Sequence, residues 1–348
     1  MSPAQALGRG VFTLSLDFEL IWGTLDRGPD AFRRACELER SVVIDRLLAL
    51  LEEFEVRATW CVLGHLFLDS CEASNGRPHP EIVPPEYSRG GREWFADDPG
   101  GTEATDPIFY GRSLVQKLMS CSVPQEIGCH SFSHPIFGDP GCSRETARTE
   151  LAECLRLAHE AGIEMRAFAF PRNRVGHLDV LREHGFSCYR GPDPTWYELD
   201  RGPKVLRRFG HLLDVLTARR PPVVLPEEIL PGLWNLPGSM IYFPMHGRRR
   251  HIPVSLRVAR ARKGLDAAAD RRHVFHLWFH PTNLADEIER SFAGLRQVLE
   301  HASRLRDQDR LSFSSMGEVI ASQAGHAGRT LDDSSTVSKK GVFLKRCE

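Results

Sequence analysis

The sequence lacks several patterns that would place it in common protein classes. Its nine cysteines contain no Cys-x-x-Cys pair, which argues against a thiolate zinc module or a redox pair of that kind. Scattered cysteines in an odd number are typical of reduced thiols in a cytosolic protein rather than of a disulfide framework. No Gly-x-Gly-x-x-Gly follows the first strand-like run, and no Gly-Lys-Ser/Thr occurs. The nucleotide-binding folds marked by these motifs are therefore disfavoured.

An excess of one charge and long apolar runs are also absent. The 45 Lys and Arg residues nearly cancel the 46 Asp and Glu residues, so no overall field favours nucleic acid as a partner. No stretch approaches the ~18 uninterrupted apolar residues of a transmembrane helix. The start, MSPAQALGRG, does not have the charged-then-apolar pattern of a secretory signal. We expect a cytoplasmic protein without a transmembrane segment; nothing in the sequence indicates an oligomeric state.

Along the chain, segments with the pattern of a strand alternate with segments with the pattern of a helix. With 41% hydrophobic and 26% charged residues, the composition is that of a globular protein. Short apolar runs predict buried strands, and amphipathic segments predict helices between them. The strands are expected at 11–16, 56–63, 126–130, 167–170, 186–190, 273–279 and 311–315, and the helices at 36–54, 112–119, 143–162, 175–185 and 284–306. This alternation predicts an α/β protein with a parallel sheet, either open or closed into a barrel.

The expected domain organisation is simple. We predict one catalytic domain over residues 1–323, with an insertion at about 70–111 that is rich in Pro, Gly, Asp and Ser. So long an irregular stretch is typical of a functional loop or of a partly ordered insertion. Residues 324–348 are predicted to form a polar, mobile tail.

Polar residues follow the predicted strands directly. Asp17, His130, Arg172 and His280 each stand at a strand end. The carboxyl ends of parallel strands open onto one face of a sheet, where catalytic groups collect. Imidazoles and a carboxylate can hold a divalent ion, while a second carboxylate and a further histidine can act as base and acid. The spacing of His130 and His134 alone decides little, because the chain has fifteen histidines.

Four segments together resemble a known family. They are SLDFELIWG (15–23), HSFSH (130–134), FPRN (170–173) and LWFHPTNL (277–284). In this order, within about residues 11–320, they resemble the successive motifs of the polysaccharide deacetylases, carbohydrate esterase family 4, also called the NodB-homology domain. The resemblance implies a distorted (β/α)7-type barrel. It also implies a divalent metal, commonly zinc, that serves to remove acetyl groups from N-acetylated sugars.

The resemblance also implies roles for individual residues. His130 and His134 match the two metal-binding histidines of the family. The family's adjacent aspartates are replaced here by Asp17-Phe18-Glu19, which implies Asp17 as base and Glu19 as third ligand. Positions 17 and 19 of a strand point to the same side, in keeping with this assignment. Asp17 as the ligand, with Glu19 elsewhere, remains the alternative.

The later motifs supply the remaining catalytic residues. Arg172 resembles the arginine that orients the base, displaced relative to the proline, and His280 resembles the acid. Each has a simpler interpretation: Arg172 can pair with a surface acid, and His280 can be structural.

Four further residues are candidates for substrate binding. The aromatic rings can either stack on a sugar or pack in the core. The candidates are Trp22, Tyr110, Asn173 and Trp278.

One charged run stands apart from these motifs. RRRHIPVSLRVARARK (248–263) clusters positive charge in an otherwise balanced chain. Such a run is either a solvated helix face or a site for the phosphate of a nucleotide-linked or lipid-linked sugar.

The function predicted from the sequence is metal-dependent amide hydrolysis. The expected substrate is a small or carrier-linked amino sugar, a precursor in glycan biosynthesis, from which an N-acetyl or other N-acyl group is removed. One alternative is hydrolysis of a non-sugar linear or cyclic amide on the same scaffold. A second is a non-catalytic glycan-binding module, which the presence of both Asp17 and His280 disfavours because binding alone needs neither base nor acid.

Overall fold

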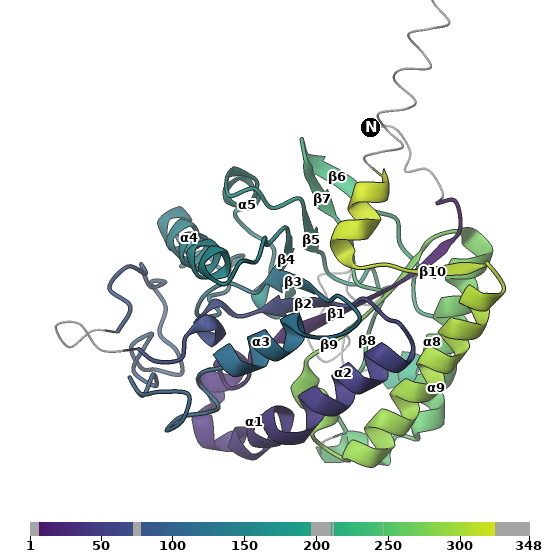
Figure 1. Ribbon diagram of the computed structural model, residues 1–348, viewed down its shortest axis with the longest axis horizontal. Coiled ribbons are helices and arrows are strands. Elements are labelled where there is room, and N and C mark those ends of the chain that lie inside the picture. The colour runs from purple at the N-terminus through teal and green to yellow at the C-terminus, as the bar shows by residue number, and fades with distance from the viewer. Residues whose placement is uncertain (1–6, 72–77, 196–209, 211, 246, 324–348) are drawn as a thin grey trace, which may run out of the picture.

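The fold is built on one curled sheet (Figure 1). The computed structural model describes residues 7–71, 78–195, 210, 212–245 and 247–323. The strands follow the order β6-β7-β5-β4-β3-β2-β1-β9-β8, with β10 also paired to β1. Their bounds are β1 (Gly10–Phe18), β2 (Thr59–Val62), β3 (Glu126–Cys129), β4 (Ala167–Ala169), β5 (Cys188–Arg190), β6 (Glu227–Leu230), β7 (Leu233–Asn235), β8 (Met240–Ile241), β9 (Val274–Phe279) and β10 (Leu311–Phe313).

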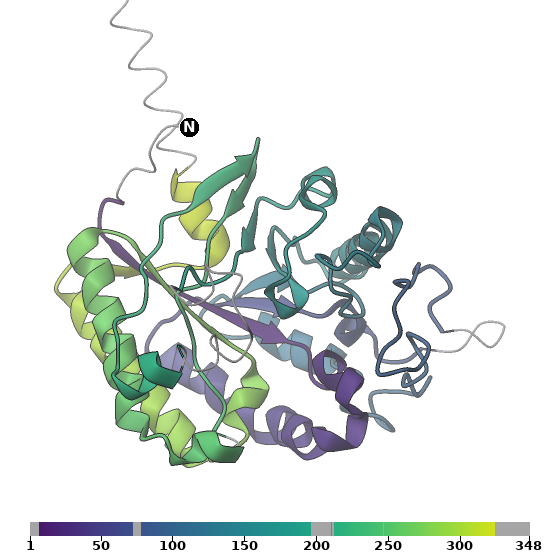
Figure 2. The same ribbon diagram turned by 180° about the vertical axis from the view of Figure 1, so that it is seen from behind.

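Strand β1 runs through the middle of the sheet and is buried along its whole length (Figure 2). It pairs in parallel with β2 and β9, so that Leu16 lies opposite both Trp60 and Phe279. This register brings the carboxyl ends of the three strands to the same edge of the sheet. Residues that follow β1 and β9 therefore meet there, although they are far apart in the sequence.

The sheet is mainly parallel. Among the described strand pairs, β6 with β7 is the antiparallel one. Strands β6 and β8 stand at the two ends of the order and do not pair with each other in the described ranges, so the curled sheet forms an incompletely closed barrel. The α/β class and the distorted barrel predicted from the sequence are confirmed.

Helices cover the outside of the sheet in both views (Figures 1 and 2). Their bounds are α1 (Arg33–Leu38), α2 (Ile44–Glu53), α3 (Arg112–Met119), α4 (Arg144–Glu160), α5 (Leu178–Glu183), α8 (Val254–Arg271) and α9 (Ile288–Asp307). Ser143 caps the start of helix α4, since its hydroxyl accepts a hydrogen bond from the Thr146 amide at 3.0 Å.

The sequence prediction differed from the structure in two regions. The segment 36–54 was expected to form one helix, but α1 and α2 are joined by a π-helical turn at Glu39–Val43. Strands β6 to β8 and helix α8 were not predicted, because residues 191–272 are rich in proline and arginine and show no clear periodicity.

The insertion lies at one edge of the molecule in both views. Its described residues, 70–71 and 78–111, form turns and isolated bridges. The predicted tail, 324–348, lies outside the described residues. Each of the eight cysteines within the described ranges is a free thiol. None of the described helices combines the length and apolar character needed to cross a bilayer.

Candidate metal centre and active site

Two histidines and one glutamate converge beyond the end of β1. The Glu19 Oε2 atom lies 3.1 Å from the His130 Nε2 atom and 3.0 Å from the His134 Nε2 atom. All three side chains are buried. Burial raises the pKa of the Glu19 carboxyl, but the facing histidines outweigh this effect and hold its pKa well below the ordinary value.

The two imidazoles reach this point by different means. His130 follows β3 directly, and its Nδ1 atom lies 2.8 Å from the Ala169 carbonyl oxygen, which can only accept a hydrogen bond. In the neutral ring the proton therefore resides on Nδ1, and the Nε2 lone pair faces Glu19. His134 stands in a tight loop where Ser131 and His134 both have left-handed backbone, with φ of 62° and 69°.

This loop is fastened from α4 by a buried carboxylate. The Glu150 Oε2 atom accepts hydrogen bonds from the Phe132 amide at 2.7 Å and the Ser133 amide at 2.8 Å, and its Oε1 atom accepts one from the Ser133 hydroxyl. Burial raises the pKa of Glu150 to about 6. The loop's amide groups are thus satisfied by a side chain that sequence reasoning did not single out.

The insertion supports the same loop from the other side. The Trp94 indole nitrogen donates to the Ser133 hydroxyl at 2.7 Å, and Arg89 donates to the Ser133 carbonyl oxygen. The Arg89 guanidinium lies over the Trp94 ring, 3.7 Å from its centroid. Residues 78–111 therefore help to position His134.

Asp17 is engaged by an arginine from a neighbouring strand. Arg190, at the end of β5, donates to the two Asp17 oxygens at 2.7 and 2.6 Å in a bidentate ion pair, and both side chains are buried. Burial raises the pKa of Asp17, but the charges of Arg190 and of the nearby histidines lower it by more than burial raises it. The net shift of the Asp17 pKa is therefore downward. Arg190 also donates to the Ser15 hydroxyl at 3.0 Å.

His280 completes the group of residues at this edge. It follows β9, and its Nε2 atom lies 3.5 Å from the Glu19 Oε1 atom and 3.7 Å from the Asp17 Oδ2 atom. Its side chain is 28% exposed, unlike those of the two acids. His280 is therefore the member of the group that stands between the buried carboxylates and solvent.

A cavity of about 290 Å³ opens on this side. Glu19, His134 and His280 line it together with Arg27, Arg172 and Arg249. The half-buried Phe32 is an aromatic ring on its wall. Reactive side chains and basic side chains thus face one shared space.

The donor atoms of Glu19, His130 and His134 fit a divalent metal. In a tetrahedral zinc site, bond lengths of about 2.0–2.1 Å place neighbouring N and O ligands about 3.3 Å apart. The Glu19 oxygen lies at close to this separation from both imidazole nitrogens, and the donor atoms of all three residues lie within 4.8 Å of one another. Asp17 is held by Arg190 instead, so the geometry favours Glu19 over Asp17 as the acidic ligand.

Arg172 does not contact the predicted base, which corrects the expectation from the sequence. It donates to Asp26 Oδ1 at 2.8 Å, and its backbone has a φ of 55° in the short turn after β4. Arg190 takes the place against Asp17. Like the other site residues, Arg190 stands at the end of a predicted strand, since it is the last residue of the strand expected at 186–190.

Two of the proposed substrate-binding aromatics are core residues. Trp22 is 1% exposed, and its indole nitrogen donates to the Phe109 carbonyl oxygen at 2.9 Å. Tyr110 is fully buried, with its hydroxyl oxygen 3.0 Å from the Cys71 sulfur. Neither ring can stack on a sugar, because other side chains cover it.

The other two candidates serve Arg190. The Arg190 guanidinium lies over the Trp278 ring, 4.3 Å from its centroid, and donates to the Asn173 side-chain oxygen at 3.2 Å. The Trp278 indole nitrogen donates to Asp193 at 2.8 Å. Their contacts are those of supporting residues rather than of substrate ligands.

Part of the basic run is occupied by internal contacts. Arg257 and Arg260 are buried in α8 and donate to the Phe243 and Arg219 carbonyl oxygens at 2.7 and 3.2 Å. The expectation of a solvated helix face is therefore wrong for these residues. Arg249, just before α8, lines the cavity.

Comparisons with known proteins identify the fold. No family model matches the sequence, and no curated protein matches it significantly. Among solved structures, a protein from Mycobacterium smegmatis assigned as a polysaccharide deacetylase matches with a TM-score of 0.61 and 16% identity, covering 100% of this chain and 99% of that one. One from Pseudomonas aeruginosa, assigned likewise, matches with a TM-score of 0.53 and 10% identity, covering 90% and 89%. PuuE allantoinase matches with a TM-score of 0.56 and 10% identity, covering 90% and 91%. The chain has the fold of the polysaccharide deacetylases, as the sequence motifs predicted.

We expect replacement of Glu150 by Gln to destabilise the loop of residues 131–134, which carries His134 and is called the histidine loop below. An amide has one accepting oxygen in place of two. If that oxygen keeps the Phe132 and Ser133 amides, the N–H group of Gln faces the Ser133 hydroxyl, which loses the acceptor for its proton. The free energy of unfolding should fall by about 1–3 kcal/mol at pH 8, measured by urea denaturation. The control Glu145→Gln, exposed on the same helix, should change it by less than about 0.5 kcal/mol. Equal stability of the two variants would contradict a fastening role for Glu150.

Proposed function

We propose that the protein is a metal-dependent hydrolase that removes an N-acetyl or other N-acyl group from an amino sugar or sugar precursor in glycan biosynthesis. The observation that supports this most strongly is the arrangement around Glu19. Two imidazoles and one carboxylate converge on a single point, with Asp17 and His280 beside them and a cavity in front. Three protein ligands leave an open position, which is typical of catalytic rather than structural metal sites.

Zinc is the metal that this donor set suits best, since imidazole and carboxylate ligands in fourfold coordination are typical of it. Glu19, His130 and His134 would hold the ion, which would supply Lewis-acid chemistry by polarising the amide carbonyl and lowering the pKa of water in the site to about 7. The chain's own residues then handle the protons and hold the geometry.

Asp17 is proposed as the general base. Its carboxylate is ionised and fixed by the two hydrogen bonds from Arg190, so it can accept a proton in a defined direction. His280 is proposed as the general acid that donates a proton to the leaving nitrogen. It is the more exposed partner and lies within 4 Å of both acids. Arg190 acts through Asp17 and is a positioning residue.

The cavity supports a small substrate that carries negative charge. A volume of about 290 Å³ is at the lower end for ligand sites. Arg27, Arg172 and Arg249 line its wall, and guanidinium groups bind phosphate through paired hydrogen bonds. A phosphate-bearing amino sugar, as in an activated precursor, matches both features.

A second candidate is hydrolysis of a non-sugar amide. One of the structures with this fold is an allantoinase, with a TM-score of 0.56. The proposed base, acid and metal ligands would serve a linear or cyclic amide equally well. A non-catalytic glycan-binding module is less favoured, because it needs neither a buried ionised Asp17 nor His280 beside it.

The substrate class is tested by measuring amide hydrolysis across a defined panel. Free N-acetyl amino sugars, their phosphate and nucleoside diphosphate esters, assembled N-acetylated polymer and cyclic ureides are each assayed with metal-loaded and metal-stripped protein. We expect metal-dependent release of amine from the phosphate-bearing monosaccharides. Turnover of polymer alone would reject the precursor assignment, and turnover of ureides alone would favour the second candidate.

The ligand set is tested by metal analysis. We expect His130→Ala and Glu19→Ala each to lower the zinc bound per chain by one equivalent relative to the wild type, because each removes one of three donors. The control His301→Ala, on α9 beside Asp266, should leave the metal content unchanged. Unchanged zinc in both ligand variants would refute this site.

The base and acid are tested separately from metal binding. Asp17→Asn and His280→Asn should each retain metal and lose about 10²–10⁴-fold in kcat, as expected for loss of general acid-base catalysis. Asp17→Asn leaves Arg190 buried without its partner, so circular dichroism must first establish that this variant is folded. His280→Asn is the less disruptive of the two, because the side chain is partly exposed. Near-normal kcat in a folded variant would remove that residue from the mechanism.

A further inference from the structure

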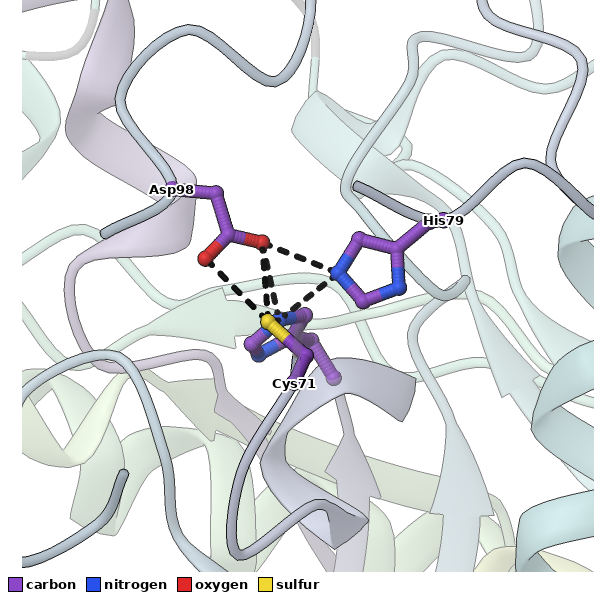
Figure 3. A group of neighbouring side chains, drawn as sticks. Cys71, His79 and Asp98 are labelled. Carbon is purple, nitrogen blue, oxygen red and sulfur yellow. Dashed lines mark hydrogen bonds and ion pairs between the residues drawn. The ribbon is translucent and has the colours of Figure 1, made fainter. Parts of the chain in front are cut away.

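A second group of side chains with metal-ligating atoms, separate from the Glu19 group, lies where the insertion packs against the residues that follow β2. His65, Cys71, His79 and Asp98 each offer one donor atom, and these atoms lie within 4.8 Å of one another. Figure 3 shows the side chains of Cys71, His79 and Asp98 pointing towards one another. The His65 and Asp98 side chains are fully buried, and that of His79 is 5% exposed.

The separations between these atoms match a tetrahedral site. The His65 and His79 Nε2 atoms are 3.1 Å apart and lie 3.2 and 2.9 Å from the Asp98 Oδ2 atom. The Cys71 sulfur lies 3.9 Å from the His65 Nε2 atom and 3.6 Å from the Asp98 Oδ2 atom. Zinc bonds of about 2.0–2.1 Å to N or O and about 2.3 Å to S place such ligands about 3.3 Å and about 3.6 Å apart.

The Nδ1 atoms of the two imidazoles are directed away from the centre. The His65 Nδ1 atom lies 3.1 Å from the Phe109 carbonyl oxygen, and the His79 Nδ1 atom lies 3.4 Å from a Glu81 carboxylate oxygen. The two Nε2 atoms and the Asp98 carboxylate therefore face one another in a buried space, where either a proton on one Nε2 atom or a metal ion must lie between them.

The other two donors have supporting contacts of the kind found around bound metals. The Asp98 Oδ1 atom accepts a hydrogen bond from the Gly100 amide at 3.0 Å, which leaves Oδ2 facing the imidazoles. The Tyr110 hydroxyl lies 3.0 Å from the Cys71 sulfur and accepts from the Gly101 amide at 3.0 Å. Such outer contacts orient metal ligands and set their protonation. His79 also has left-handed backbone, with φ of 52°.

We propose that His65, Cys71, His79 and Asp98 bind a zinc ion that fixes the insertion against the barrel. Four protein donors fill a tetrahedral shell, which is the arrangement of structural rather than catalytic zinc. The site is adjacent to the histidine loop: the His65 amide donates to the Phe132 carbonyl oxygen at 3.1 Å, and the His79 and Phe132 ring centroids are 4.9 Å apart. An ion that holds His65 and His79 in place therefore also supports the loop that carries His134.

Cobalt substitution separates this site from the Glu19 site, because a thiolate is a ligand in the second group alone. Full-length protein without a histidine tag is stripped of metal and titrated with Co²⁺. We expect a near-ultraviolet thiolate-to-cobalt absorption band in the wild type and in His134→Ala, and its loss in Cys71→Ser. The matched control Cys121→Ser, a half-buried cysteine beside Glu52, should keep the band. A wild-type protein that binds cobalt without this band would overturn the proposal.

Metal content and stability give an independent measurement. We expect two zinc equivalents per chain in the wild type, one each in His134→Ala and Cys71→Ser, and none in the double variant. Zinc should raise the Tm of His134→Ala, which retains only the proposed site, and should not raise that of the double variant. A zinc content of one equivalent in both wild type and Cys71→Ser would show that the cluster is a hydrogen-bonded group without metal. Because His134→Ala lacks the Glu19 site, this result is independent of the proposed hydrolase activity.

Discussion

The burial of two carboxylates at the end of β1 sets the main physical requirement of this structure. An isolated buried charge is strongly unfavourable, so each acid needs its own partner. Asp17 forms a bidentate ion pair with Arg190, and Glu19 contacts the imidazoles of two histidines. These partners come from different strands of the sheet, which explains why residues distant in sequence converge here. Arg190 in turn lies on Trp278 and contacts Asn173, so several buried residues serve to hold one ion pair.

The histidine loop is held from outside the barrel rather than by regular secondary structure. Its amide groups have no strand to pair with, and buried amides without partners cost free energy. Glu150 from α4 and Trp94 from the insertion provide the missing hydrogen bonds. The insertion is therefore part of the architecture of the site, although none of its described residues forms a hydrogen bond or ion pair with the Glu19 side chain. A zinc ion bound by the proposed four ligands would stabilise the histidine loop through the contacts of His65 and His79 with Phe132.

Much of the architecture could be predicted from the sequence, because short buried strands alternating with amphipathic helices specify an α/β sheet. The rule that functional residues follow strands located Asp17, His130 and His280, and it applies equally to Arg190. It failed for the expected role of Arg172, which enters a left-handed turn after β4 and contacts Asp26, while Arg190 contacts Asp17. Sequence patterns could not locate the cluster of His65, Cys71, His79 and Asp98. Their irregular spacing matches no motif, and only the tertiary path of the insertion brings them together.

The two clusters differ in a way that suits different roles. The group around Glu19 has three donors and borders a cavity that also contains His280, so a fourth position is open to a reactant. The group around Asp98 has four donors, with its carboxylate and one imidazole fully buried, so no position remains for a substrate. Donor number and access to solvent, rather than the kinds of ligand alone, distinguish a site for chemistry from one for stability. By this criterion the catalytic proposal rests on the Glu19 group, and the inserted segment contributes to catalysis only through the position of the histidine loop.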